Sequence, residues 1–177
     1  MRIKAAYRRI RSRRWSALIL DLGLFAAVFW AITAWQTRHL LPGDQLAQAP
    51  GFTLPALDGQ TYTLEQALGK PVLLYFFAPW CSVCNLSAHN LRDLRDARSD
   101  DELAIYLIAS GYGDSTSVRA FAEKHRLTMP ILLDNGRVAA DYRVEATPTY
   151  YVIDAQGRVQ DRSVGYSTEW GLRWRTL

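Results

Sequence analysis

The sequence predicts an α/β domain with a mixed central β-sheet and helices on both faces, preceded by one transmembrane helix. Three observations support this fold class. A long apolar segment lies near the N-terminus, apolar runs of strand length alternate with stretches of helical periodicity, and turn signals mark a hairpin at each end of the domain. Alternating strands and helices place strands in parallel, and the closing hairpin adds antiparallel ones, so the sheet is mixed.

A basic arm and an apolar segment open the chain. The arm, residues 1–14, contains seven basic residues and no acidic one: Arg2, Lys4, Arg8, Arg9, Arg11, Arg13 and Arg14. Residues 15–35 form an apolar run of 21 residues, and a helix of that length spans about 30 Å, the thickness of the hydrocarbon core of a bilayer. Because basic residues stay on the cytoplasmic side, we expect a single-pass anchor with a cytoplasmic N-terminus and an extracytoplasmic domain.

Two features of the N-terminal region leave alternatives open. Residues 47–49, Ala-Gln-Ala, have the form of a signal-peptide cleavage site. The site lies well beyond an apolar run that is long for a signal peptide, and Pro50 would follow the cut, so an uncleaved anchor is favoured. The carboxylate of Asp21 is costly inside a bilayer. It either reaches the interface, which we favour, or pairs with Arg13 or Arg14, or faces another membrane helix.

The positive charge of the chain belongs to the arm. The whole sequence contains 21 basic and 17 acidic residues, whereas residues 36–177 contain 14 and 16. A nucleic-acid-binding domain would have a basic surface of its own. We therefore expect no nucleic-acid partner.

A tether and a hairpin follow the anchor. Residues 36–50 lack apolar periodicity and contain a Pro-Gly pair, which predicts a tether. Residues 51–177 are then one domain, long enough to bury a core. Its first elements are strands at 52–57 and 60–63 around Asp58-Gly59, a dipeptide typical of tight hairpin turns, and one helical turn at 64–68.

The middle of the domain alternates strands with helices. Apolar runs predict strands at 71–77, 103–109 and 129–133. A helix is expected from residue 81 to about residue 98, and a second, capped by Asp114 or Ser115, to about residue 126. After a turn at 134–136, the C-terminal part predicts a helical turn at 138–142, a second hairpin with strands at 149–153 and 158–164, and a closing helix at 167–177.

The chain's two cysteines, Cys81 and Cys84, form a Cys-x-x-Cys pair between a predicted strand and a predicted helix. Unpaired N–H groups and the dipole at a helix N-terminus favour a thiolate there. The pair therefore predicts a dithiol/disulfide redox centre, in which the Cys81–Cys84 disulfide is the redox group and no further cofactor is needed.

Two other uses of a cysteine pair are less favoured. A zinc site would need two more ligands, but the three histidines (His39, His89 and His125) have no paired spacing, so we predict no metal site. A structural disulfide over two intervening residues would remove little entropy from the unfolded chain.

Three phrases resemble a known family: Pro50-Gly-Phe-x-Leu with Asp58-Gly59, residues 69–84 ending in Ala-Pro-Trp-Cys-Ser-Val-Cys, and residues 146–149, Ala-Thr-Pro-Thr. With them the chain from residue 50 to about residue 166 resembles the thioredoxin superfamily. Within it, the closest likeness is to the TlpA/ResA-like branch of membrane-anchored thiol:disulfide oxidoreductases, which have an added N-terminal β-hairpin. Residues 75–84 and 165–173 further resemble the suppressor-of-copper-sensitivity protein D group. The resemblance implies a thioredoxin-like fold, a bacterial inner-membrane anchor and a periplasmic domain.

The resemblance also implies roles for individual residues. Cys81 would be the exposed attacking thiolate, and Cys84 the buried thiol that resolves the mixed disulfide. The Thr147–Pro148 bond would be cis, facing the Cys81 sulfur and offering backbone groups to a partner peptide, whereas the residues alone indicate only a proline at a strand entry. Trp80 would pack over the dithiol, the alternative being a buried aromatic residue without such a role.

The chain departs from the family at positions next to the cysteines. Tyr75 stands where many thioredoxins have a buried acid, and Ser87 where ResA-like proteins often have a glutamate, so no internal proton acceptor for Cys84 is evident. Residues 82–83, Ser-Val, also differ from the usual pairs. The reduction potential is therefore left open.

These features predict a thiol:disulfide oxidoreductase that reduces protein disulfides outside the cytoplasm. Its dithiol would need electrons from a membrane-embedded donor, because an oxidising compartment would otherwise hold it as a disulfide. One alternative is an oxidant or isomerase on the same fold, with a membrane acceptor. Another is a Cu(I) chaperone that adds a third ligand such as His125 to the two thiolates. A peroxidase is disfavoured because Cys81 is not preceded by the Pro-x-x-x-Thr-x-x pattern of peroxidatic cysteines.

Overall fold

The computed structural model describes residues 20–35, 37–43 and 47–177. The chain divides into two units, Met1–Arg38 and His39–Leu177, each considered by itself. The predicted basic arm and the first five residues of the predicted anchor lie outside the described residues.

In the N-terminal unit, residues 20–35 are helical. The large apolar side chains of this helix are exposed around its whole circumference, among them Leu20, Phe25, Trp30 and Trp35. Among the residues that the structure describes, no helix combines the length and the apolar character needed to cross a membrane.

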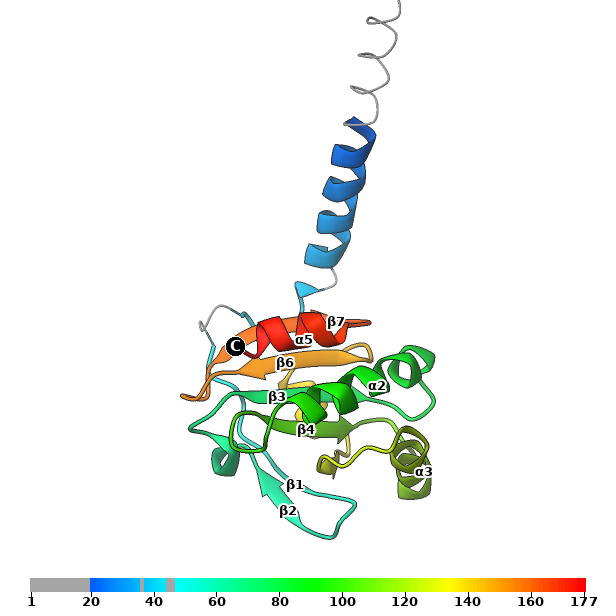
Figure 1. Ribbon diagram of the computed structural model, residues 1–177, viewed down its shortest axis with the longest axis vertical. Coiled ribbons are helices and arrows are strands. Elements are labelled where there is room, and N and C mark those ends of the chain that lie inside the picture. The colour runs from blue at the N-terminus through cyan, green and yellow to red at the C-terminus, as the bar shows by residue number, and fades with distance from the viewer. Residues whose placement is uncertain (1–19, 36, 44–46) are drawn as a thin grey trace, which may run out of the picture. The chain divides into compact units, whose positions relative to one another are not determined.

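The second unit is built on a five-stranded mixed sheet with strand order β5-β4-β3-β6-β7 (Figure 1). β3 (Val72–Phe77), β4 (Ala104–Ala109) and β5 (Ile131–Leu133) are parallel, whereas β6 (Thr149–Ile153) is antiparallel to β3, and β7 (Val159–Val164) to β6. All six residues of β3 are buried, as expected for a central strand covered on both faces. The predicted mixed sheet is confirmed.

The sheet separates two layers of core. Leu73, Tyr75 and Phe77 of β3 pack with apolar residues of α2 (Ser82–Ala97), α3 (Ser115–His125) and α5 (Glu169–Arg175). The alternate residues of β3 pack on the other face with the N-terminal hairpin and α4 (Arg137–Asp141). In Figure 1, α2 and α5 lie over the near face of the sheet. Helices on both faces were predicted, and this is confirmed.

The N-terminal hairpin forms a separate two-stranded sheet of β1 (Thr53–Pro55) and β2 (Thr61–Thr63), followed by the 3-10 turn η1 (Glu65–Ala67). Asp58 accepts a hydrogen bond from the backbone N–H of Gln60, and Gly59 has a φ of 81°, which suits glycine. β1 and β5 are shorter than the predicted strands. β1 ends at Pro55, and Pro130 directly precedes β5.

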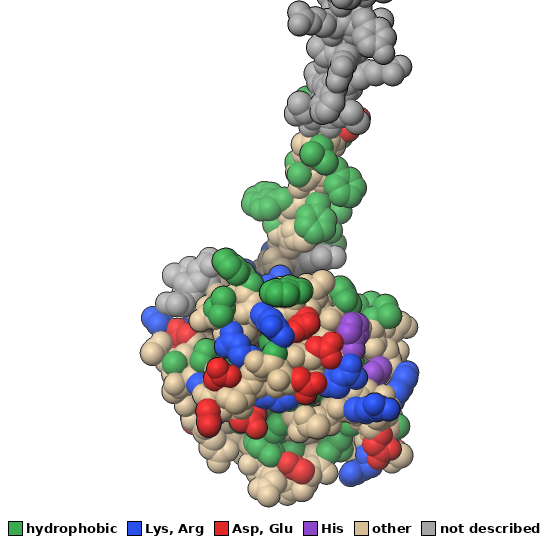
Figure 2. Space-filling view, viewed as in Figure 1, with side chains coloured by type: hydrophobic (Ala, Val, Ile, Leu, Met, Phe, Trp, Pro, Cys, Tyr) green, Lys and Arg blue, Asp and Glu red, His purple; other side chains and the backbone are tan. Residues whose placement is uncertain are grey.

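The surface carries mixed charge. Figure 2 shows Lys and Arg side chains interspersed with Asp and Glu over the face of the second unit.

Candidate active site

The two cysteines lie where β3 passes into α2. β3 ends at Phe77, and Cys81 is the N-cap of α2, with an extended backbone at φ −73° and ψ 117°. Its Sγ accepts a hydrogen bond from the backbone N–H of Cys84 at 3.2 Å. A sulfur thus takes the place of the oxygen that usually caps a helix, and an N–H of the first turn points at it.

The two sulfurs have different environments. Burial opposes the ionisation of Cys81, but hydrogen bonds from the Cys84 thiol, the Cys84 N–H, the Thr147 side chain and the Val83 N–H outweigh it, so the pKa of Cys81 is lowered. Cys84 is fully buried, and this burial together with its hydrogen bond to Cys81 raises the pKa of its thiol. The attacking role fits the sulfur with the lowered pKa.

The resemblance implies an exposed Cys81, and this is wrong, since the residue is only 7% exposed. The segment before β6 contributes to the cover, because the Cys81 thiol lies 3.4 Å from the Thr147 carbonyl oxygen and can donate to it. The Thr147–Pro148 peptide bond is cis, as the resemblance implies, and Pro148 is buried. The structure therefore brings Cys81, Cys84, Thr147 and Pro148 together.

The alternative that Trp80 is a buried aromatic residue is wrong. Its side chain is 74% exposed, and its indole N–H donates to the Gly111 carbonyl oxygen at 2.9 Å. Gly111 belongs to the loop between β4 and α3. The indole ring therefore presents an apolar surface to solvent beside the Cys-x-x-Cys motif.

Hydroxyl groups occupy the two positions beside the cysteines at which the resemblance led us to look for an acid. The Tyr75 hydroxyl lies 3.0 Å from Ser87 Oγ, and Ser87 Oγ donates to the Val83 carbonyl oxygen at 2.9 Å. Both side chains are fully buried, Tyr75 on β3 and Ser87 on α2. Burial raises the pKa of Tyr75, so it stays neutral and does not act as a base.

Asn85 is a residue that the sequence did not single out. Its side-chain amide donates to the carbonyl oxygens of Pro79 at 3.2 Å and Cys81 at 3.0 Å, and its Oδ1 accepts from Lys124 at 2.8 Å. His125 Nε2 contacts the same oxygen at 2.9 Å. Asn85 thereby ties the cysteine turn to α3, a long-range contact for which a lone asparagine gives no signal.

A Cu(I) site at the two sulfurs would need a third ligand such as His125. Its Nε2 instead contacts Asn85, and its ring packs on Phe121 with centroids 4.6 Å apart. Within the described ranges, no group of three or more His, Cys, Asp and Glu side chains could hold a metal ion.

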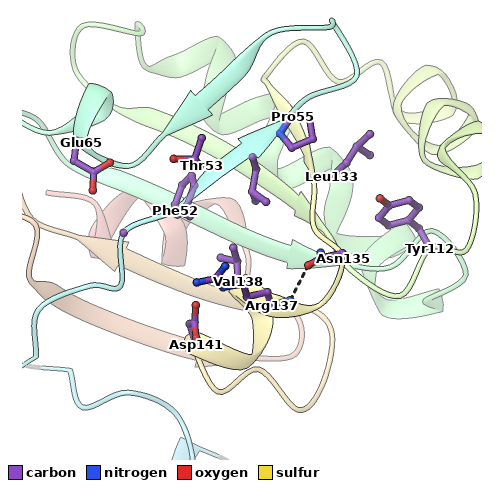
Figure 3. A pocket seen from close by; sticks show the side chains of 12 residues that line it. Phe52, Thr53, Pro55, Glu65, Tyr112, Leu133, Asn135, Arg137, Val138 and Asp141 are labelled. Atoms are coloured by element: carbon purple, nitrogen blue, oxygen red, sulfur yellow. Dashed lines mark hydrogen bonds between the residues drawn. The ribbon is translucent and has the colours of Figure 1, made fainter.

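A groove of about 670 Å³ lies away from the cysteines, between the hairpin and the segment from β5 to α4 (Figure 3). Apolar residues such as Phe52 and Val138 line it together with Glu65, Arg137 and Asp141. Figure 3 also shows the hydrogen bond from the Arg137 backbone N–H to Asn135. Neither cysteine lines this groove.

Comparison with known proteins agrees with the geometry of the site. The family model described as AhpC/TSA family matches residues 46–162. The thioredoxin-like protein YneN of Bacillus subtilis is 35% identical over 159 residues, covering 89% of this chain and 93% of the relative. The thiol-disulfide oxidoreductase ResA of Geobacillus kaustophilus is 32% identical over 122 residues, covering 68% and 70%.

Solved structures show the same fold. The structure of MTB dsbF in its mixed oxidized and reduced forms has a TM-score of 0.65 and 28% identity, and the match covers 77% of this chain and 97% of that one. StoA from Bacillus subtilis has a TM-score of 0.65 and 21% identity, with 73% and 98% covered, and this likeness concerns the fold alone.

Proposed function

We propose that this chain, a member of the AhpC/TSA family, uses Cys81 and Cys84 to reduce protein disulfides outside the cytoplasm. Within that family it is a thioredoxin-like thiol-disulfide oxidoreductase of the TlpA/ResA-like group. The observation that carries the proposal is the asymmetry of the pair. The sulfur at the helix N-cap has a lowered pKa, and the sulfur one turn later is buried with a raised pKa.

The asymmetry sets the order of the two exchange steps. The Cys81 thiolate attacks one sulfur of a substrate disulfide, a Cys81–substrate bond forms, and the other substrate sulfur leaves and takes up a proton. The Cys84 sulfur, having lost its proton, then attacks Cys81 Sγ. The Cys81–Cys84 disulfide forms, and the second substrate sulfur leaves and is protonated. Two electrons pass from the dithiol to the substrate.

The surroundings of Cys81 support a place for an extended substrate segment. The Thr147 carbonyl faces the sulfur, and Pro148 follows at the start of β6. A bound peptide could pair with the backbone around Thr147 as an added strand does. The exposed indole of Trp80 would cover apolar substrate side chains on the other side of the motif.

Reduction outside the cytoplasm requires a source of electrons. We assign this supply to a membrane-embedded donor, because an oxidising compartment returns the pair to the disulfide after each turnover. A membrane anchor at residues 15–35 would keep the domain near such a donor. The seven basic residues of the arm and the exposed apolar side chains of residues 20–35 support this arrangement. A reporter fused after Gln48 should lie outside the cytoplasm and sediment with membranes, and a soluble product that starts near residue 50 would show a cleaved segment instead.

The test of the function is to trap the mixed disulfide. Cys84→Ser removes the resolving nucleophile and leaves Cys81 free to attack, so reductant-sensitive covalent complexes with exported proteins should accumulate. Wild type resolves such complexes quickly, because the attack of Cys84 is intramolecular. Cys81→Ser is the matched control and should trap far fewer. If Cys84→Ser forms no covalent complexes and the reduced wild type binds Cu(I) tightly, the copper carrier would be favoured instead.

The direction of electron flow needs a separate measurement. A reductase should have a reduction potential near that of thioredoxin, about −270 mV, whereas an oxidant of the DsbA kind lies near −120 mV. Equilibration of the full-length protein with glutathione buffers, followed by mass spectrometry of the alkylated protein, measures it. A value at the oxidising end would replace the reductase with an oxidant or isomerase.

A further inference from the structure

A positively charged surface lies beside the cysteine turn, where α3 meets α2. Lys124 and His125 form the last turn of α3, and His89 and Arg92 lie on α2. After burial, the groups that act most on the pKa of His125 are Lys124, Arg92 and His89, and each of them can carry positive charge. Figure 2 shows histidine side chains beside Lys and Arg side chains over α2. The side of the active site toward α3 is therefore basic.

Asn85 connects this surface to the attacking cysteine. Its amide nitrogen donates to the carbonyl oxygens of Pro79 and Cys81, so its Oδ1 is left as the acceptor toward α3. Lys124 Nζ donates to that oxygen at 2.8 Å. His125 Nε2 lies 2.9 Å from the same oxygen, so the proton of its neutral ring is on Nε2. Two hydrogen bonds through one amide therefore link the Lys124 ammonium to the Cys81 backbone.

The charge of Lys124 remains available to a substrate. Lys124 is exposed, and its partner Asn85 offers a neutral oxygen that does not cancel the charge. An ammonium has three N–H donors, of which this contact uses one. Within the part of the chain that the structure describes, Lys124 forms no ion pair, whereas the neighbouring Arg92 pairs with Asp93 at 3.1 Å. Lys124 thus presents a full positive charge to solvent beside the active site.

A substrate disulfide has to approach Cys81 within the field of this charge. Each residue of an extended substrate segment advances by about 3.3–3.6 Å, so the neighbours of the substrate cysteine stay close to the reacting sulfurs. Charges separated by less than the Debye length, about 8 Å at physiological salt, still act on each other. An acidic neighbour of the substrate cysteine would therefore speed the encounter with Cys81, and a basic neighbour would slow it.

We propose that Lys124, held by Asn85, selects substrate disulfides in which acidic residues flank the attacked cysteine. The inference rests on the proposed function and adds a substrate class to it. The Cys81 thiolate attacks the substrate sulfur, a Cys81–substrate bond forms, and the other sulfur leaves with the electron pair of the broken bond and takes a proton from solvent. Lys124 keeps its own proton throughout and contributes attraction to the acidic side chain.

Three peptides that differ only in charge test the inference. Each has blocked ends and contains Glu-Cys-Glu, Gln-Cys-Gln or Lys-Cys-Lys, with the cysteine joined to 2-thiopyridine as a mixed disulfide. Reduced full-length protein releases one absorbing thiopyridone per peptide, and the rate of release reports the attack by Cys81. Absence of release from the Gln peptide would contradict the proposed function. Release from all three peptides at one rate would contradict this inference alone.

Wild type should attack the Glu peptide about two- to fivefold faster than the Gln peptide, the size expected of one exposed ion pair, and the Lys peptide more slowly than either. Raising KCl to about 0.5 M should bring the three rates together, because salt screens exposed charges. Lys124→Gln should reduce the advantage of the Glu peptide, and Lys124→Glu should reverse the order of the three. A residue that only supported the fold would change the three rates by the same factor.

Lys70→Gln is the matched control, since it removes the same charge at a distant position. Lys70 precedes β3, whereas the cysteines follow the other end of that strand, and its Nζ donates to the Asp100 carbonyl oxygen. This variant should keep the three rates of wild type. An undiminished preference for the Glu peptide in Lys124→Gln, or equal slowing of all three peptides, overturns the proposal. If neither Lys124 variant folds, wild-type rates that do not respond to KCl overturn it.

Discussion

The hydrogen bond from the Cys84 thiol to Cys81 can be tested with two substitutions at one position. Cys84→Ser keeps a donor of nearly the same size, whereas Cys84→Ala removes the donor. Both leave Cys81 as the single thiol of the chain, and both retain the backbone N–H of residue 84 that points at its sulfur. The pKa of Cys81 should stay low in Cys84→Ser and rise in Cys84→Ala.

The size of the rise follows from the donors around the sulfur. The Cys84 thiol is the leading one, ahead of the Cys84 N–H, the Thr147 side chain and the Val83 N–H. A hydrogen bond to a charged acceptor is worth about 1.5–3 kcal/mol, and a thiol is a weak donor, so we take the lower end, or about one pKa unit. The N–H groups of Cys84 and Val83 and the Thr147 side chain remain in Cys84→Ala and still oppose the effect of burial on this pKa.

Alkylation by iodoacetamide, followed by mass spectrometry over a range of pH, measures this pKa directly. Below the pKa, a rise of one unit lowers the thiolate fraction about tenfold, and the greater nucleophilicity of a more basic thiolate restores about threefold. Cys84→Ala should therefore react about three times more slowly than Cys84→Ser at a pH below both pKa values. Identical titration curves for the two variants would refute a role of the residue 84 side chain in lowering the pKa.

Two further predictions concern the scaffold of the site. Burial, and then the charge of Lys124, lowers the pKa of His125 below its usual 6.5. The unfolded chain therefore binds this proton more readily than the folded protein does. The free energy of unfolding should fall as the pH drops below 6.5. Urea midpoints of His125→Gln should show less of this fall than wild type, and equal slopes would contradict the assignment. Asp134 is buried and accepts the N–H groups of Val138 at 3.0 Å and Ala139 at 2.9 Å. Asp134→Ala should cost about 2–4 kcal/mol in urea unfolding and Asp134→Asn about half as much, whereas equal losses would argue against the hydrogen bonds.

The order of strands and helices could be predicted because its signals are local. The apolar runs that become β3 and β4, the Asp58-Gly59 turn and the capping residue Asp114 each act through neighbours in the chain. The position of the cysteines at the start of a helix could also be predicted, since the prediction needs only a strand followed by an amphipathic segment. Strand lengths were less accurate, since β1 covers Thr53–Pro55 and β5 Ile131–Leu133, both shorter than predicted.

Other parts of the site depend on contacts between distant segments. Thr147, which lies 66 positions away in the sequence, contacts Cys81 and helps to bury it. Asn85 contacts Lys124 and His125 across α2 and α3. The exposure of Trp80 could not be predicted from the sequence, because its indole N–H is held by the Gly111 carbonyl oxygen in the loop after β4. Composition and periodicity contain no information on such pairs.

The division of labour between the cysteines follows from the geometry of one helical turn. The N-cap position places the Cys81 sulfur in front of unpaired N–H groups, which stabilise negative charge there. The position three residues later turns Cys84 into the core, where burial keeps its thiol protonated. The arrangement that favours attack by Cys81 thus opposes ionisation of Cys84. Since the hydroxyls of Tyr75 and Ser87 contact the Cys84 carbonyl oxygen, the rate of the second step should respond to their substitution more than the rate of the first step does.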